Sequence, residues 1–252
     1  MGVLNVTPDS FSDGGRWLSP ADAIAHGLDL WAEGADLIDV GAESTRPGST
    51  RISVEEEWHR LAPVLPVLLS EGLRVSVDTI HADTARRAID AGVHYVNDIS
   101  GGCFDPEMNR VVAEGDVGYI VQHWRGFPGD PDLDESYRDV LQDVLDETLA
   151  QVERAREAGV KAERIVIDPG LGFALTGPQC WKIVENLGTW VAEPYPVLVG
   201  ASRKRFVRER YPENVDEGTL AVTRLCWQAG VWGVRVHDVA ANRRLVAQMN
   251  GA

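Results

Sequence analysis

One unit repeats eight times along the chain: a short apolar run, a polar or glycine-containing loop, and a helical stretch. Runs of this length bounded by turn residues are typical of buried strands, and their alternation with helices predicts a parallel sheet. The runs are residues 2–6, 36–40, 73–78, 94–98, 118–123, 164–168, 196–202 and 233–238. Because crossovers between parallel strands are right-handed, two architectures are compatible with this pattern: an open doubly wound sheet and a closed barrel. Eight units favour a (β/α)8 TIM barrel, and no GxGxxG motif follows the first run to favour a dinucleotide-binding sheet.

The chain length fits one such barrel. A (β/α)8 barrel commonly has about 250 residues, so the 252 residues here predict a single domain, 1–252. Helices are expected between the runs, among them 21–33, 54–69, 82–91, 133–157 and 219–229. Five glycines stand where a helix C-cap is expected: Gly34, Gly72, Gly92, Gly159 and Gly230.

Charge and composition exclude several classes of partner. The formal net charge is -15, whereas nucleic acids and anionic membranes require a basic surface, so neither is an expected partner. No apolar run reaches the 18 or so residues of a membrane span, and polar residues interrupt the N-terminus where a secretion signal would be apolar. The expected location is therefore the cytoplasm. The three cysteines have neither disulfide nor zinc-ligand spacing.

Polar residues lie where the predicted strands end. In a barrel these ends carry the functional loops. They hold Asn5, Asp39, Asp78, Asn97, Asp98, His123, Asp168, Ser202, Lys204, Arg235 and His237. An Asp or Ser taken alone is explained equally well as a helix cap, and a lone Arg or His is more often a salt-bridge partner. So many costly buried groups at one end instead indicate a ligand that pairs with them.

The residue types suggest two halves of such a ligand. Acceptors on Asp78, Asn97 and Asp168 suit a flat heterocycle with N–H donors. Lys204, Arg235 and His237 suit the oxygens of an anion, and phosphate commonly binds near the last two strands of such barrels.

Seven motifs together resemble the dihydropteroate synthases of folate biosynthesis. They occur in order over nearly the whole chain: GVLNVTPDSFSDGG, DVGAESTRPG, VSVDT, NDISGG, DPGLGF, GASRKRF and RVHDV. The resemblance implies a (β/α)8 barrel and a transferase. Its reaction joins 4-aminobenzoate to 6-hydroxymethyl-7,8-dihydropterin diphosphate, with release of diphosphate, and sulfonamides inhibit it.

The resemblance also implies roles for individual residues. Pterin contacts correspond to Asp78, Asn97, Asp168 and Lys204. Diphosphate contacts correspond to Asn5, Arg235 and His237, with Asn5 also the contact for Mg²⁺, and Phe173 and Val236 are further substrate-binding positions. Two loops over the site would supply Phe11, Asp13, Thr45, Arg46 and Pro47 to the aminobenzoate pocket, and the helix start at Lys204 and Arg205 would meet the aminobenzoate carboxylate. Asp168, Lys204, Arg235 and His237 would be catalytic, and the family suggests a homodimer.

Departures from the family pattern leave alternatives open. Leu175 stands where many members have lysine, Arg205 replaces a frequent serine, Ala42 replaces a glycine, and the chain starts almost inside its first strand. A methyltetrahydrofolate-dependent methyltransferase would share the barrel and the pterin acids. A non-catalytic pterin-binding paralogue would share the whole site.

Overall fold

Eight parallel strands alternate with helices, as the sequence predicts. The computed structural model describes residues 1–7, 19–44 and 49–251. Its strands are β1 (Gly2–Asn5), β2 (Ile38–Gly41), β3 (Val75–Asp78), β4 (Tyr95–Asp98), β5 (Gly118–Gln122), β6 (Ile165–Asp168), β7 (Leu198–Val199) and β8 (Gly233–Val234). Each lies within one of the eight predicted runs, except that β2 extends one residue beyond its run, to Gly41. The prediction that 1–252 forms one domain stays a prediction.

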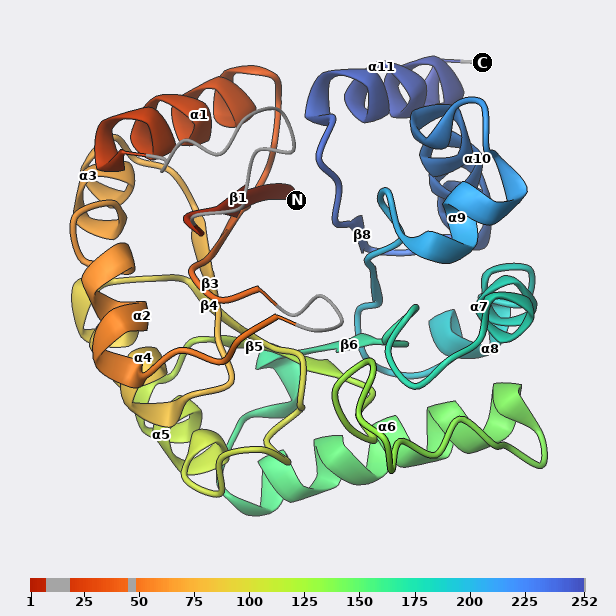
Figure 1. The fold of residues 1–252 in the computed structure, drawn as a ribbon, viewed down its shortest axis with the longest axis horizontal. Coiled ribbons are helices and arrows are strands. Elements are labelled where there is room, and N and C mark those ends of the chain that lie inside the picture. Colours follow the sequence, from red (N-terminus) through yellow and green to blue (C-terminus); the bar gives the residue numbers. More distant parts are fainter. Residues whose placement is uncertain (8–18, 45–48, 252) are drawn as a thin grey trace.

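Helices surround the strands on the outside (Figure 1). They are α1 (Pro20–Ala32), α2 (Val54–Leu61), α3 (Leu65–Ser70), α4 (Ala82–Ala91), α5 (Met108–Gly115), α6 (Val140–Glu157), α7 (Gly177–Val184), α8 (Gly188–Val191), α9 (Arg205–Arg210), α10 (Val215–Ala229) and α11 (Val239–Asn250), with a short 3₁₀ turn at Ala162–Arg164. The five glycines expected at helix C-caps all have positive φ, between 80° and 107°. Within the described residues, no helix is long and apolar enough to cross a membrane.

Three predicted helices have clearly different limits. The stretch 219–229 begins earlier, at Val215, where Asn214 caps α10 by accepting from Glu217 N. The stretch 54–69 is divided into α2 and α3, and Pro63 and Pro66 lie at and just after the break. Proline cannot donate the backbone hydrogen bond that would continue a helix. The stretch 133–157 begins instead at Val140, where Asp139 caps the helix by accepting from Leu141 N. The prediction of a helix from residue 133 was therefore wrong at its start.

The barrel closes through two short contacts at β7 and β8. Strands β1 to β6 form one sheet in chain order, and β7 pairs with β8. Ile167 of β6 bridges to Val197 next to β7, and Gly2 of β1 bridges to Val236 just after β8. Val3 N donates to Val236 O at 3.0 Å and Val236 N donates to Met1 O at 2.9 Å. These bonds join the first strand to the last, so the (β/α)8 barrel is closed.

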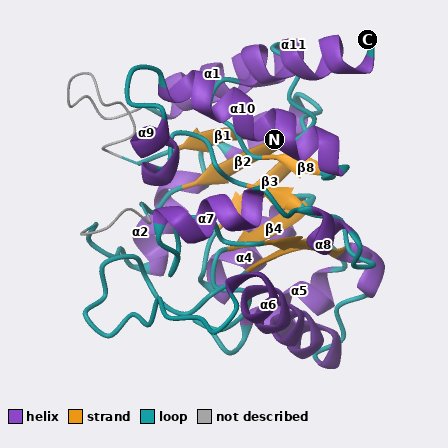
Figure 2. Ribbon diagram, turned by 90° about the vertical axis from the view of Figure 1, so that its right-hand side faces the viewer, coloured by secondary structure: helices purple, strands orange, loops and turns teal. Residues whose placement is uncertain are grey.

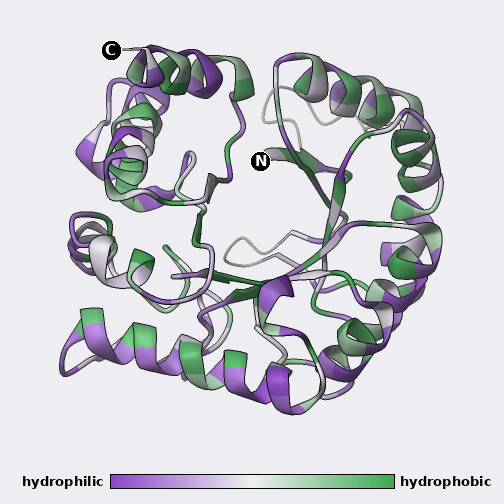
Figure 3. Cartoon of the chain, turned by 180° about the vertical axis from the view of Figure 1, so that it is seen from behind, coloured by the Kyte–Doolittle hydropathy of each residue, from purple (hydrophilic) through white to green (hydrophobic). Residues whose placement is uncertain are grey.

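The inner and outer faces of the strands differ in chemistry. Outward residues such as Ile38, Val40, Val75 and Val77 pack in the main apolar core beneath the helices. Figure 3 shows the same division, with apolar colour concentrated on the helix faces toward the sheet. The alternating positions face inward. Among these inward positions, Ile120, Val166 and Leu198 form a separate small apolar cluster inside the barrel. The polar residues at the strand ends therefore lie next to a packed apolar interior.

Candidate functional site

The long loops gather at one end of the barrel, on the left in Figure 2. This is the end at which the parallel strands finish. Strand alternation and register place polar residues of neighbouring strands side by side there: Asp78 lies beside Asn97, and Gln122 beside Asp168. The site therefore follows from a period of two along each strand and from parallel pairing.

Arg235 joins two carboxylates across the barrel interior. It follows β8, and its Nε donates to Asp39 Oδ2 on β2 at 2.5 Å. Its Nη2 donates to Asp78 Oδ2 on β3 at 2.8 Å. Asn97 Nδ2 of β4 donates to the same Asp39 oxygen at 3.0 Å. Three strands and the residue that follows β8 thus contribute to one cluster, which we call the rim cluster (Asp39, Asp78, Asn97 and Arg235).

Asp39 is the residue whose importance sequence reasoning missed. Its place at a strand end was noted, but no role was assigned to it. The side chain is fully buried, and among the residues that the structure describes Oδ1 has no hydrogen-bond partner. A buried acceptor of this kind is costly unless a ligand donates to it. The signal in the sequence was an acidic residue inside an apolar run, which a buried strand rarely contains without a partner.

Asp168 and Lys204 face the rim cluster from β6 and from the turn after β7. Asp168 is buried, and Gly170 N donates to its Oδ1 at 2.7 Å. Lys204 Nζ donates to Leu171 O at 2.5 Å and lies 4.9 Å from the centre of the Phe173 ring. A Cβ on Gly200 would lie 3.8 Å from both Asp168 Oδ2 and Lys204 Nζ. The missing side chain at Gly200 leaves space between these two charges.

Burial and charge pull the pKa values of this site in opposite directions. Burial raises the pKa of Asp78 to about 7, although Arg235 opposes the shift. Burial likewise raises the pKa of Asp168, against the effect of Lys204, and lowers the pKa of Lys204 to about 8, against the effect of Asp168. For Arg235, burial is outweighed by Asp39 and Asp78, so its pKa is raised and it stays charged. Perturbed groups gathered at one place are typical of functional sites.

The remaining predicted residues differ in how they lie. Asn5 ends β1 next to Gly41 and is half-buried. His237 Nδ1 lies 3.0 Å from Ser202 Oγ, which links the ends of β7 and β8. Val236 is buried and its N–H is engaged in barrel closure. The side chain of Arg205 is 76% exposed and lies 3.6 Å from Glu209. Phe11, Asp13, Thr45, Arg46 and Pro47 lie outside the described residues.

A closed barrel with carboxylates, an amide and cations at its strand ends defines a class: a (β/α)8 protein that binds a polar small molecule at that rim. The chain belongs to the pterin binding enzyme family, whose model matches residues 1–237.

Named relatives agree with this assignment. The chain is 46% identical to a dihydropteroate synthase of Mycobacterium leprae, over 96% of this chain and 89% of the relative. It resembles a solved dihydropteroate synthase of Clostridium difficile, determined in the presence of pteroic acid, with a TM-score of 0.92, 38% identity, and coverage of 100% of this chain and 95% of the other. It also resembles the dihydropteroate synthase of Xanthomonas albilineans solved with 4-aminobenzoic acid. The TM-score is 0.90 and the identity 37%, with coverage of 100% of this chain and 92% of the other.

Proposed function

We propose that this chain condenses 6-hydroxymethyl-7,8-dihydropterin diphosphate with 4-aminobenzoate, giving 7,8-dihydropteroate and diphosphate. The observation that carries the proposal is the rim cluster facing Asp168 and Lys204 in a barrel whose relatives are dihydropteroate synthases over nearly their full length. The relatives favour this activity over a methyltransferase or a non-catalytic pterin-binding paralogue.

Acceptors at the rim match the donors of a pterin. Asp168, Asp78 and Asn97 offer carboxylate and amide oxygens to ring N–H and amino groups. Asp39 Oδ1 is a further buried acceptor. Phe173 is buried beside Lys204 and provides an apolar face for the flat ring. In this proposal, hydrogen bonds from the pterin offset the unfavourable burial of several carboxyl groups inside the barrel.

Cations at the rim match the diphosphate. Arg235, Lys204 and His237 come from the ends of β7 and β8, where barrels commonly hold phosphate groups. Arg235 is occupied by Asp39 and Asp78 in this structure. Diphosphate binding must therefore compete for part of its guanidinium group, and that competition leaves the carboxylates freer to accept from the pterin.

The proposed chemistry requires no nucleophile from the protein. The bond between the exocyclic carbon and the diphosphate oxygen breaks, with its electron pair leaving on diphosphate. The aminobenzoate nitrogen then bonds to the resulting pterin cation and loses a proton. Fixed cations stabilise the leaving group, and the carboxyl groups of Asp39, Asp78 and Asp168 stabilise the cation. Both effects strengthen when water is excluded.

A magnesium ion fits the donor set at the end of β1. In the described ranges, no group of three or more His, Cys, Asp or Glu side chains is arranged to hold a metal. Mg²⁺, however, usually takes only one or two protein oxygens together with phosphate oxygens and waters. The amide oxygen of Asn5 can supply one of them. When bound, the ion would offset charge on the diphosphate.

The aminobenzoate pocket remains part of the proposal. It assigns apolar walls to Phe11 and Pro47, polar contacts to Asp13, Thr45 and Arg46, and the carboxylate contact to the chain around Lys204 and Arg205. Sulfonamides would compete for the same pocket.

A direct assay tests the proposal. Purified protein with both substrates and Mg²⁺ should release diphosphate and form dihydropteroate, and chelation of Mg²⁺ should abolish turnover. Asp168→Asn should weaken pterin binding at least tenfold, since a charge-assisted hydrogen bond is lost. If pterin binds but no dihydropteroate forms, the non-catalytic alternative is correct.

A homodimer in the cytoplasm is also proposed. A groove of about 500 Å³ between α10 and α11 is lined by Leu220, Ala221 and Leu245 together with Arg224 and Arg244. Apolar side chains combined with arginine are typical of protein–protein interfaces. Light scattering of the purified protein would give the assembly directly, and a monomeric mass at all concentrations would reject the dimer.

A further inference from the structure

The turn after β6 holds two groups of the site in place. Gly170 N donates to Asp168 Oδ1, and Phe173 N donates to Gly170 O at 2.9 Å. Leu171 O accepts from Lys204 Nζ. The turn then passes through Ala174, whose φ is +48°. An L-residue in this left-handed region is unfavourable by about 1 kcal/mol, so contacts from elsewhere must stabilise the conformation.

Tyr137 supplies such a contact from the loop before α6. Its hydroxyl group donates to Ala174 O at 2.9 Å. Tyr137 is half-buried, and burial raises its pKa, so the hydroxyl stays protonated and remains a donor at neutral pH. The loop between β5 and α6 is thus tied to the turn that carries Phe173.

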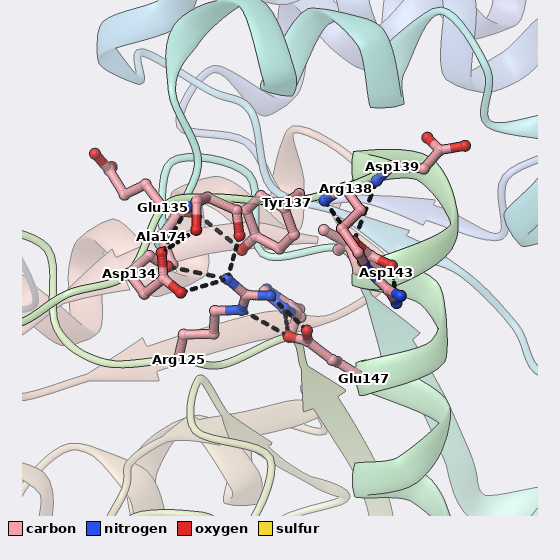
Figure 4. A network of polar contacts seen from close by, with 12 residues as sticks. Arg125, Asp134, Glu135, Tyr137, Arg138, Asp139, Asp143, Glu147 and Ala174 are labelled. Carbon is pink, nitrogen blue, oxygen red and sulfur yellow. Dashed lines mark hydrogen bonds and ion pairs between the residues drawn. The ribbon is translucent and has the colours of Figure 1, made fainter.

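Arg125 fixes Tyr137 in turn (Figure 4). Its guanidinium carbon lies 3.9 Å from the centre of the Tyr137 ring. Its Nη1 donates to Ser136 O at 2.7 Å and to Asp134 O at 3.2 Å. Its Nε and Nη2 donate to the two oxygens of Glu147 on α6 at 2.8 and 2.6 Å. One side chain therefore joins the end of β5, the loop and the helix.

Glu147 completes the connection to the barrel. Arg125 and His123 lower the pKa of Glu147 to about 2, so it stays ionised. His123 Nε2 lies 2.9 Å from Glu147 Oε2, and His123 N donates to Asp168 O at 2.9 Å. A cavity of about 420 Å³ adjoins this network. The Arg125 donors beside this cavity are already directed at Glu147 and backbone carbonyl groups, so they are not available to an anion.

We propose that Tyr137 is a positioning residue for the pterin pocket: held by Arg125, it fixes the carbonyl group of Ala174 and thereby the turn that places Phe173 and Leu171 against Lys204. The proposal rests on the function proposed above. It predicts that Tyr137 acts on pterin binding although it belongs to none of the strand-end motifs.

The variant Tyr137→Phe tests this with little structural change. It keeps the ring beneath Arg125 and removes only the hydroxyl group. The KM for the pterin substrate should rise about three- to tenfold, the effect of one lost hydrogen bond. The KM for aminobenzoate and kcat should change less than twofold. Tyr195→Phe, on the loop before β7 at the other end of the barrel, is the matched control and should change nothing.

Direct binding separates this proposal from the proposed function. Calorimetry with 6-hydroxymethylpterin as the probe should show the same loss of affinity in Tyr137→Phe, even in a protein that does not turn over. Arg125→Lys should weaken pterin binding in the same direction, and the double variant should lose less than the sum of the two, because both act through one path. Unchanged pterin affinity in Tyr137→Phe, or an equal rise of KM for both substrates, would overturn the proposal.

Discussion

Asp78 lies in the rim cluster between opposing influences on its charge. Burial disfavours its ionised form and Arg235 favours it, and the resulting pKa is about 7, near neutral pH. The ionised form accepts hydrogen bonds at both oxygens, whereas the protonated form has one oxygen less available. The affinity for a pterin should therefore rise severalfold between pH 6 and pH 8, with a midpoint near 7. Calorimetry across this range measures it, and Asp78→Asn should abolish the midpoint. An unchanged midpoint in that variant would assign the titration to another group.

The same shift affects folding. The folded protein binds the Asp78 proton more tightly than the unfolded chain, whose carboxyl group titrates near 3.8. Between pH 4 and pH 7 the unfolded state therefore holds fewer protons, and this group makes the fold less stable as pH rises. Asp168, whose pKa is also raised, acts in the same direction. Glu147 has the opposite effect, at lower pH. Its ionised form stabilises the fold, and this stabilisation is lost only as pH falls from about 4.5 toward 2. Without a ligand, the buried carboxyl groups of Asp78 and Asp168 thus lower the free energy of unfolding at neutral pH.

Residue chemistry could be predicted from the sequence more fully than residue pairing. Acids and amides at strand ends indicated a ligand rich in donors, and Asp78, Asn97 and Asp168 do lie at one rim. The pairing of Arg235 with Asp39 and Asp78 was not predictable, because it joins residues 157 and 196 positions apart. The interior geometry of the closed barrel decides that contact, and no local pattern encodes it.

Among the elements, α2 and α4 are joined by a buried polar contact. Glu57 of α2 is fully buried, and Thr84 Oγ1 of α4 donates to its Oε2 at 2.5 Å. Thr84→Val keeps the shape and removes the donor, leaving the Glu57 carboxyl group poorly satisfied. The free energy of unfolding should fall by about 1–3 kcal/mol. Urea unfolding measures it, with Ser70→Ala as control, since the exposed Ser70 hydroxyl bonds only within the end of α3. Equal losses in both variants would show that burial of the partner does not matter.

Element limits show where local signals are sufficient. Ser19, Asn214 and Asp238 cap α1, α10 and α11 with hydrogen bonds that depend on neighbouring sequence alone. The segment before Val140 reads as helical from residue 133. It forms a loop instead because backbone carbonyl groups of Asp134 and Ser136 bond to Arg125, and Tyr137 reaches Ala174. Tertiary contacts outweigh helix propensity there.

At the scale of the molecule, the barrel is unevenly supported. Strands β1 to β6 form a continuous ladder, whereas β7 and β8 have two residues each, pair with each other, and join β6 and β1 through single bridges. Regions with few backbone bonds open at lower free energy than the rest. We therefore expect β7, β8 and the turns that follow them to open most easily, and these turns carry Lys204, Arg235 and His237.

Ligand binding should strengthen β7, β8 and these turns selectively. A pterin diphosphate that contacts Asp78 and Asn97 of the ladder as well as Lys204 after β7 would connect the ladder to β7 and β8. Hydrogen exchange measured by mass spectrometry should show residues 196–202 and 233–238 exchanging faster than β2 to β5 in the free protein. Their protection should increase most when ligand is added, because binding free energy adds to the cost of opening the segment that contacts the ligand.

Uniform protection across all eight strands in the free protein would contradict this account of the closure. Equal ligand effects on all strands would mean that the site is coupled to global unfolding rather than to local opening of the last two strands.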